Sequence, residues 1–252
     1  MIIFLQVILG VLIVFSIVSV IQVIVLRFIP VKTTPLMWLR CRQQRKRGER
    51  TRLHHQWIPF KDIPEDFKTA VWVAEDVHFI SHFGFDFFKV FHNIKYYFID
   101  KVKFKTAFGG MSTISQQTAK NVFLWQGRSI LRKVLECYYT VLIELFWGKQ
   151  RIMEVYLNSI EMGDGIYGVY AAAKEHYHCE PSELTREQIA EIVTCLPNPL
   201  KYHCTDIHYP SLLKSKERIL MGMDGLHFPR PEEFAKVQWQ HRLKALNKLF
   251  GK

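Results

Sequence analysis

The sequence predicts a mainly α-helical protein with one membrane helix at its N-terminus, and three observations support this. Residues Ile2 to Leu26 contain no charged side chain. After Trp57, apolar residues mostly recur every three or four positions, which is the period of an amphipathic helix. Serine, threonine, proline and glycine separate these segments, and no internal repeat occurs. The 252 residues include 19 Phe, 10 Tyr and 6 Trp, enough for one folded domain beside the anchor.

Residues 1–29 are predicted to form a retained transmembrane anchor. The uncharged segment is long enough to cross a bilayer core of about 30 Å with some tilt. No basic segment precedes it and no small-residue cleavage site follows it, so we do not expect a cleaved signal peptide.

The net charge of +11 is concentrated just after this anchor. Ten Lys and Arg residues and a single acid, Glu49, lie between Arg27 and Lys61. We predict a basic linker over residues 30–56 that suits anionic lipid head groups, and its degree of order is left open. The positive-inside rule would place this flank in the cytoplasm. Nucleic acid is not expected as a partner, because no nucleic-acid-binding motif accompanies the charge.

A carboxylate pair, Glu75–Asp76, follows an apolar helix. Asp62 and Glu65 are expected to cap this helix where it begins at Pro64. One face should carry Phe67, Ala70, Val71 and Ala74. Since Glu75 ends an apolar segment, it should be partly desolvated, which raises its pKa toward that of a general acid or base. The alternative is a helix end with two solvated acids.

The segment from Phe85 to Phe108 places Phe and Tyr among lysines. At helical spacing, an apolar stripe is formed by Phe87, Val90, Phe91, Ile94 and Phe98. One interpretation is an amphipathic helix packed on the core. The other is a helix in the membrane interface, where aromatic residues and lysines are both favoured.

Residues Gly110 to Asn121 are dense in hydrogen-bonding groups. The set comprises Ser112, Thr113, Gln116, Gln117, Lys120 and Asn121. Gln116, Gln117 and Lys120 fit one helical face, and helix N-termini and hydroxyls bind anions. A plain helix N-cap is the alternative.

Residues Arg128 to Glu136 place three cations and one acid on a single helix. Arg132 is four residues before Glu136, and Lys133 is three before it. The opposite face is expected to be buried and carries Leu131, Val134, Leu135, Tyr138, Val141, Leu142 and Leu145. The cations form either a solvated face or a site for a diphosphate, whose developing oxygen charge needs such donors.

The rest of the chain is predicted to be helical as well. We expect helices within Lys149–His178, from a capping box at Thr185 and Gln188 to Leu196, and over Ser211–Phe250 with a loop near Gly225. The five cysteines define neither a disulfide framework nor a zinc site. The histidines lack the His-Glu-x-x-His spacing of a helical zinc pair.

Five motifs, in order, resemble those of peptidoglycan glycosyltransferases (glycosyltransferase family 51), and more closely those of the monofunctional biosynthetic transglycosylases of Gram-negative bacteria. The first four read Glu75-Asp76-x-x-Phe79-x-x-His82-x-Gly84, Gly110-x-Ser112-Thr113-x-x-Gln116-Gln117, Arg132-Lys133-x-x-Glu136 and Lys149-x-x-Ile152-x-Glu154-x-Tyr156-Leu157-Asn158. The fifth is degraded, because Ser215 replaces a basic residue four positions before Ile219-Leu220. The resemblance covers about residues 57–220.

This resemblance implies a lysozyme-like, two-lobed glycosyltransferase domain over residues 57–252, with a large lobe and a membrane-associated jaw at about residues 85–108. It implies polymerisation of lipid II into glycan strands for cell wall biogenesis and cell shape. The acceptor 4-hydroxyl attacks the anomeric carbon, and undecaprenyl diphosphate leaves with inversion. We expect a monofunctional enzyme, because the chain stops where a bifunctional one would continue into a transpeptidase domain.

The resemblance also implies roles for individual residues. Glu75 is implied as the catalytic base, and Glu136 as a second catalytic residue or a group that positions cations. Substrate contacts are implied for Ser112, Gln116, Gln117, Lys120, Asn121, Arg128, Arg132 and Lys133. Asp76, His82 and Gly84 are expected to hold local structure. No cofactor is required for certain, and a divalent cation (Mg²⁺ or Mn²⁺) near Glu136 is left open.

Expected partners are lipid II, the growing glycan strand, membrane lipids, and proteins of cell-wall synthesis and division. The expected location is the cell inner membrane, with a single pass and the catalytic domain in the periplasm; here the family is followed over the charge rule. Two alternatives remain. A lytic enzyme on the same fold would cleave glycan strands but leaves the cationic face unexplained. The other alternative is a non-catalytic cell-wall scaffold.

Overall fold

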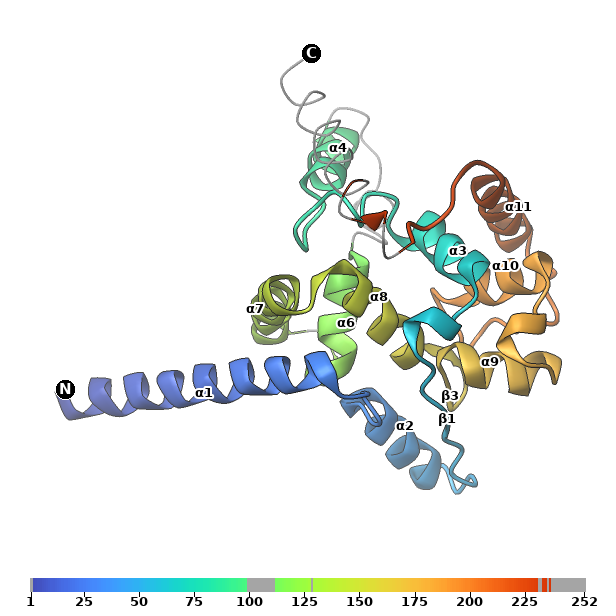
Figure 1. The fold of residues 1–252 in the computed structure, drawn as a ribbon. Coiled ribbons are helices and arrows are strands. Elements are labelled where there is room, and N and C mark those ends of the chain that lie inside the picture. Colours follow the sequence, from blue (N-terminus) through green and yellow to red (C-terminus); the bar gives the residue numbers. More distant parts are fainter. Residues whose placement is uncertain (1, 99–111, 128, 231–232, 235, 237–252) are drawn as a thin grey trace, which may run out of the picture.

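The computed structural model describes the chain except for residues 1, 99–111, 128, 231–232, 235 and 237–252 (Figure 1). Helix α1 (Ile2–Phe28) projects from the folded body as a single rod. By length and composition it is long and apolar enough to cross a membrane, and little of it is buried. This agrees with the anchor that the sequence predicts.

The body is built mainly from helices, which confirms the predicted class. They are α2 (Pro35–Lys46), α3 (Glu65–Glu75), α4 (Phe87–Phe98), α6 (Ile114–Phe123), α7 (Ile130–Phe146), α8 (Gly148–Ser159), α9 (Gly168–Tyr177), α10 (Arg186–Cys195) and α11 (Pro210–Gly225), with short 3-10 helices at Phe60–Asp62 and Pro181–Glu183. A small sheet has the order β1 (His54–His55), β3 (Ile166–Tyr167) and β2 (Glu161–Gly163). β1 is parallel to β3, and β2 is antiparallel to it.

Helix α8 lies at the centre of the core. It packs against α6, α7 and α9, while α3 packs against α10 and α11. Five apolar side chains of α8 are fully buried, namely Ile152, Met153, Val155, Tyr156 and Leu157. The burial of these side chains places α8 in the protein interior. Helices α6 and α7, which carry part of the candidate site, pack on it.

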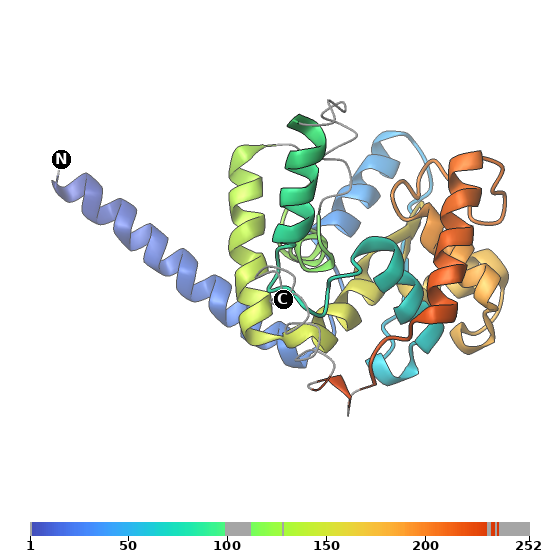
Figure 2. The ribbon, with the colours of Figure 1, turned by 90° about the horizontal axis from the view of Figure 1, so that it is seen from above.

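The C-terminal half of α1 is attached to the body through polar contacts. Three hydrogen-bonding side chains of the α7–α8 segment reach α1 and the residue after it. The contacts join Tyr138 Oη to Ser19 Oγ (2.7 Å), Trp147 Nε1 to the carbonyl of Val23 (2.7 Å), and Arg151 Nη2 to the carbonyls of Leu26 (2.8 Å) and Ile29 (2.5 Å). The last carbonyls of a helix lack intrahelical partners, so a guanidinium there serves as a C-terminal cap. Figure 2 shows the end of α1 running beside α7.

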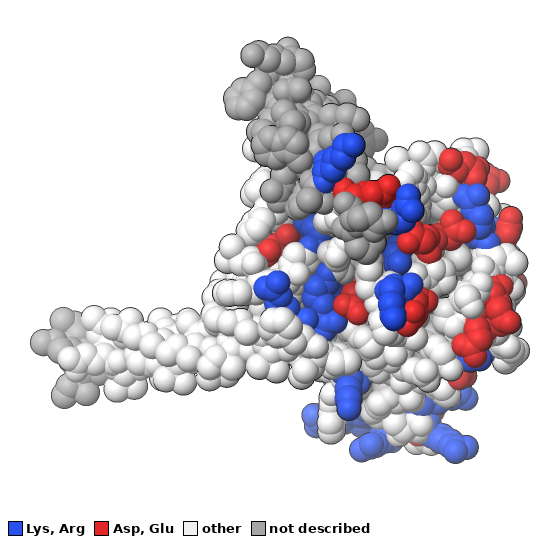
Figure 3. All heavy atoms as spheres, viewed as in Figure 1, with Lys and Arg blue, Asp and Glu red and all other residues white. Residues whose placement is uncertain are grey.

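The basic segment after the anchor contains an ordered helix, α2. The sequence predicts a basic linker here and leaves its order open; in the structure Pro35 is the first residue of α2 and Thr34 caps this helix. The guanidinium of Arg40 forms a two-pronged ion pair with Glu161 (2.9 Å for both Nε and Nη2), which fastens α2 to the sheet. Figure 3 shows Lys and Arg side chains gathered around α2.

Three details differ from the sequence-based expectations. Asp62 and Glu65 do not cap α3, because Pro64 occupies the N-cap position and no side chain bonds there. The aromatic side chains of Phe87 and Phe91 on α4 are exposed, so packing of these two on the core is wrong. On α7, four residues expected to be buried are exposed, namely Leu131, Val134, Val141 and Leu145. Helical periodicity defines an apolar face but not the medium that covers it.

Other expectations are confirmed or concern residues outside the described part of the chain. The capping box of Thr185 and Gln188 is confirmed at the start of α10. All five cysteines are free thiols. The first part of the predicted helical tail is confirmed as α11, which ends at Gly225. Residues 99–110 and, in the tail, 231–232, 235 and 237–250 lie outside the described residues.

Candidate active site

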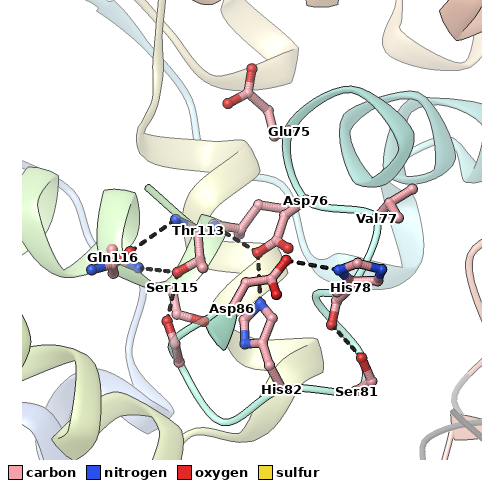
Figure 4. Close-up of polar contacts among 12 residues, drawn as sticks. Glu75, Asp76, Val77, His78, Ser81, His82, Asp86, Thr113, Ser115 and Gln116 are labelled. Atoms are coloured by element: carbon pink, nitrogen blue, oxygen red, sulfur yellow. Dashed lines mark hydrogen bonds and ion pairs between the residues drawn. The ribbon is translucent and has the colours of Figure 1, made fainter. Parts of the chain in front are cut away.

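Glu75 is the last residue of α3 and opens onto a cavity of about 500 Å³. The cavity lies between the end of α3 and the first turns of α4 and is also lined by His78, Phe88, Lys89 and His92. The helix ends because Asp76 leaves helical geometry (φ −157°, ψ 76°). The two adjacent carboxylates therefore point in different directions, as Figure 4 shows.

The carboxylate of Glu75 is partly buried, and among the described residues Gln117 donates a hydrogen bond to it. Gln117 Nε2 donates to Glu75 Oε2 at 2.7 Å. Burial raises the pKa of Glu75 from its usual 4.5, and the charge of Asp76 raises it further. The hydrogen bond from Gln117 and the charges of Lys89 and Lys120 lower that pKa, but burial has the largest effect. A carboxyl group in this state is suited to accept a proton near neutral pH.

Asp76 has a different environment from its neighbour. It is buried, and its Oδ2 is 2.9 Å from His82 Nε2 and accepts a hydrogen bond from the backbone N–H of Ile114 at 3.1 Å. These contacts join the end of α3 to the start of α6. Asp76 and His82 hold local structure, as the sequence predicts.

The turn from α3 to α4 is fastened at several points. His78 Nδ1 and Asp86 Oδ2 are 2.8 Å apart. The hydroxyl of Thr113 donates to the carbonyl of Gly84 at 2.7 Å. Gly84 has φ +78°, and a Cβ there would lie 2.7 Å from the methyl group of Thr140, so a side chain does not fit. The turn that forms one wall of the cavity is thus rigid.

The polar residues of α6 have two different roles. Thr113 and Gln116 form a capping box, with both bonds at 3.1 Å, so the N-cap interpretation holds for this pair. Gln117 instead turns toward Glu75. Ser112 is half-buried just before the helix, and Asn121 is buried near its end. Gln116 therefore serves the start of the helix rather than the cavity.

The cations of α7 gather around Glu136, as their spacing predicts. Arg132 Nη1 lies 2.5 Å from Glu136 Oε2, and Lys133 pairs with the other carboxylate oxygen. Glu136 is buried, whereas the Lys133 side chain is half-exposed. Arg132 Nε is buried with no hydrogen-bond partner among the described residues. Arg128 lies outside them.

Lys120 of α6 connects the two parts of the site electrostatically. Burial lowers the pKa of Lys120, and so do the charges of Arg132 and Lys133. The charges of Glu136 and Glu75 raise it. The ammonium group therefore lies in the fields of both acids, between the carboxylate region and the cationic region.

The donor set near Glu136 does not fit a divalent cation. Both oxygens of this carboxylate are paired with cations. Among the described residues, no group of three or more His, Cys, Asp or Glu side chains is placed to hold a metal ion. Mg²⁺ prefers carboxylates that are free to bind it. Arginine and lysine thus supply the positive charge here.

For two sets of residues at or near the site, the sequence did not indicate the position or the contacts that the structure shows. Lys89 and His92 line the cavity from α4, but the sequence marks them only as polar positions of an amphipathic helix. Ser115, Glu144 and Lys149 form a buried network behind Gly84, with Glu144 Oε1 accepting bonds of 2.5 Å from both partners. No local spacing pattern reveals contacts between three different helices.

Comparisons with known proteins identify the family of this chain. The sequence model of a family described as Transglycosylase matches residues 43–224. A protein of Bacteroides thetaiotaomicron named biosynthetic peptidoglycan transglycosylase is 46% identical over 220 residues, which cover 86% of each chain. Proteins with the same name are 47% identical over 183 residues in Caulobacter vibrioides (73% of this chain, 75% of that one) and 45% identical over 185 residues in Pseudomonas entomophila (73% and 76%).

Proposed function

This chain belongs to the transglycosylase family, and from that premise we propose how its cavity polymerises lipid II into glycan strands. The protein is a glycosyltransferase of peptidoglycan synthesis with a lysozyme-like, mainly α-helical domain. The family match and the names of the relatives do not favour a lytic enzyme or a non-catalytic scaffold. What remains to be proposed is the role of each side chain.

Glu75 is the general base of the proposed reaction. It takes the proton of the acceptor 4-hydroxyl while that oxygen attacks the anomeric carbon of the growing chain. An alcohol is a weak nucleophile until its proton is removed, and a base with a raised pKa can remove it near neutral pH. The observation that carries this proposal is a partly buried carboxylate at a helix end, facing a cavity of about 500 Å³.

Lys120, Arg132 and Lys133 stabilise the departing diphosphate. As the new bond from the acceptor oxygen to the anomeric carbon forms, the bond to the diphosphate oxygen breaks and that oxygen takes the electron pair. Cationic hydrogen-bond donors stabilise the charge that develops there. Arg132 supports this role because its buried Nε has no partner among the described residues.

Glu136 acts mainly through these cations. Its carboxylate holds Arg132 and Lys133, so we assign it a positioning role rather than an independent acid–base step. Ser112 and Asn121 remain proposed substrate contacts beside α6. In the proposed step, Lys and Arg side chains neutralise the charge of the departing diphosphate, and no role is assigned to Mg²⁺ or Mn²⁺.

The protein is proposed to lie in the cell inner membrane, with α1 as a single-pass anchor and the catalytic domain in the periplasm. Exposed apolar side chains of α4 and α7, such as Phe87 and Leu131, support contact with membrane lipids. The Arg40–Glu161 ion pair ties the basic helix α2 to the folded domain, so these charges belong to that domain rather than to a free flank. Proteins of cell-wall synthesis and division remain predicted partners.

The test is polymerisation of purified lipid II by the full-length protein and its Glu75→Gln variant. Loss of a general base should lower the rate about 10²–10⁴-fold. Glu65→Gln is the matched control, because Glu65 is an exposed acid at the other end of the same helix. The melting temperature of Glu75→Gln should not fall, since a desolvated charge is removed. Undiminished polymerisation by this variant would refute the base role, and cleavage of sacculi without polymer formation would favour the lytic alternative.

The pH dependence gives a second test. Since burial raises the pKa of Glu75, the ionised base is lost at a higher pH than it would be for an exposed glutamate. The rate should therefore fall as pH decreases through this raised pKa, above the usual 4.5. Initial rates across pH, with Glu65→Gln in parallel, check this. A rate that declines only near 4.5 contradicts it.

A further inference from the structure

A chain of three side chains connects the core to the proposed base. Tyr156 lies in the last turn of α8 and is fully buried. Its hydroxyl donates to Gln117 Oε1 at 3.3 Å, and Gln117 Nε2 donates to Glu75 Oε2 at 2.7 Å. The three residues come from α8, α6 and α3, so the chain crosses the core.

The chemistry of the two outer residues fixes the direction of this chain. A glutamine amide has an acceptor end and a donor end, and rotation of the amide exchanges them. Burial raises the pKa of Tyr156 well above its usual value, and the charges of Glu75 and Asp76 raise it further. Tyr156 therefore keeps its proton, and in the structure this hydroxyl donates to the carbonyl end of Gln117. With the amide held this way, its NH₂ end faces the Glu75 carboxylate.

The opposite orientation of Gln117 would be unfavourable while Glu75 is ionised. It would place the amide oxygen against a carboxylate oxygen, with no proton between them. On the other side of this amide, the Tyr156 hydroxyl is a donor to Gln117 Oε1, so it stabilises the same orientation that the Glu75 carboxylate requires.

We propose that Tyr156 is a positioning residue for the glycosyl transfer: it holds Gln117 with its N–H toward Glu75, and so keeps Glu75 in the ionised form that accepts the proton. This inference rests on the proposed role of Glu75 as the base.

Other charged groups also face Glu75 and set the background for this effect. Lys89 approaches from α4, Lys120 from α6 and Asp76 from the adjoining residue. The two lysines favour the ionised form, whereas Asp76 and burial oppose it. Replacing the Tyr156 hydroxyl changes none of these charges, and the hydrogen-bonded route from this hydroxyl to Glu75 passes through Gln117.

The experiment uses Tyr156→Phe in the full-length protein. Tyr167→Phe is the matched control, because Tyr167 is also fully buried and also donates a 3.3 Å hydrogen bond, but to Glu161. Two quantities are measured: the pH profile of lipid II polymerisation, and the ¹³C titration of the Glu75 carboxyl, whose signal is assigned by its absence in Glu75→Gln. The second measurement does not depend on activity.

In Tyr156→Phe, both the acidic limb of the rate profile and the carboxyl titration should move to higher pH. At pH values within that acidic limb, the rate of Tyr156→Phe should be about 3–10-fold lower than that of the unchanged protein, with little change in KM, as expected for the loss of one hydrogen bond. Tyr167→Phe should move neither. An unmoved titration in Tyr156→Phe overturns the proposal.

A double-mutant cycle tests whether Gln117 carries the effect, and it remains informative if Tyr156→Phe alone folds poorly. Gln117→Ala should shift the Glu75 titration in the same direction, and Tyr156→Phe should add nothing in that background. An equal further shift would show that Tyr156 acts by another route and would overturn the proposal. If the titration shifts as expected while Glu75→Gln still polymerises lipid II, the positioning chain stands and only the base role fails.

Discussion

The two ends of helix α7 each bury a glutamate paired with a lysine, yet they are built differently. Near the N-terminal end, Glu136 pairs with residues of its own helix, and the side chain of Lys133 is half-exposed. About two turns later, Glu144 pairs with Lys149 of α8 and Ser115 of α6, and the charged side chains there are almost fully buried.

This difference separates a site from a structural contact. A pair made within one helix and open to solvent can exchange its partner for a substrate oxygen at modest cost. A sealed pair between helices cannot, because either charge alone would be left in the core without compensation. Lys149 also lies 4.5 Å from the centre of the Phe79 ring, which adds a further contact inside the core. The three substitutions below test the contrast, from the largest expected effect to the smallest.

Lys149→Met should be the most damaging change to stability. It leaves the carboxylate of Glu144 buried and without its cation, which typically costs about 3–5 kcal/mol of unfolding free energy. Denaturant unfolding of the full chain in detergent measures it. Lys133→Met is the matched control. Because Glu136 keeps its ion pair with Arg132, the unfolding free energy of this variant should fall by about 1 kcal/mol or less. Equal losses in the two variants would remove the distinction between the two ends.

Arg132→Ala should affect activity far more than stability. The loss of a charge-assisted donor to the leaving diphosphate should reduce kcat/KM for lipid II about 10–100-fold. Arg132→Lys should recover only part of this, because a lysine lacks the planar fork of the guanidinium. Polymerisation kinetics measure both variants. Full activity in Arg132→Ala would mean that this end of α7 does not contact the leaving group.

Leu131→Ser should have the smallest effect, because the side chain lies on the outer, exposed face of α7. We expect the unfolding free energy in detergent to change by less than about 0.5 kcal/mol. Leu142→Ser on the buried face of the same helix should lose about 2–4 kcal/mol. Unfolding curves of the two variants, measured in detergent, give the two losses to be compared. A large loss for Leu131→Ser would indicate that protein covers this face.

The sequence predicts those features that depend on residues close together in the chain. The pairing of Arg132 with Glu136 follows from the helical repeat, and so does the capping box at Thr185. The position of Glu75 at a helix end was likewise predictable from the apolar segment before it.

Contacts between distant segments were not predictable in this way. Lys149 is only five residues from Glu144, but Gly148 (φ +72°) breaks the helix between them and sets the geometry of the pair. Gln117 is 42 residues from Glu75, and no pattern along the chain links them. The outer face of α7 shows a third limit, since an apolar stripe has the same period whether protein or lipid covers it.

The polar contacts of α1 have a consequence for how the enzyme meets its substrate. Ser19, Val23 and Leu26 follow one another at helical spacing, so their contacts with Tyr138, Trp147 and Arg151 fix both the rotation and the axial position of the rod. With α1 as the proposed anchor, the height of the cavity above the bilayer is set by helix geometry and not by the reach of a tether. The diphosphate of a lipid-linked substrate is held at the membrane surface by its lipid. It would then lie at the same distance from the bilayer as Lys120 and Arg132, so the domain would not have to move along the membrane normal to bind it.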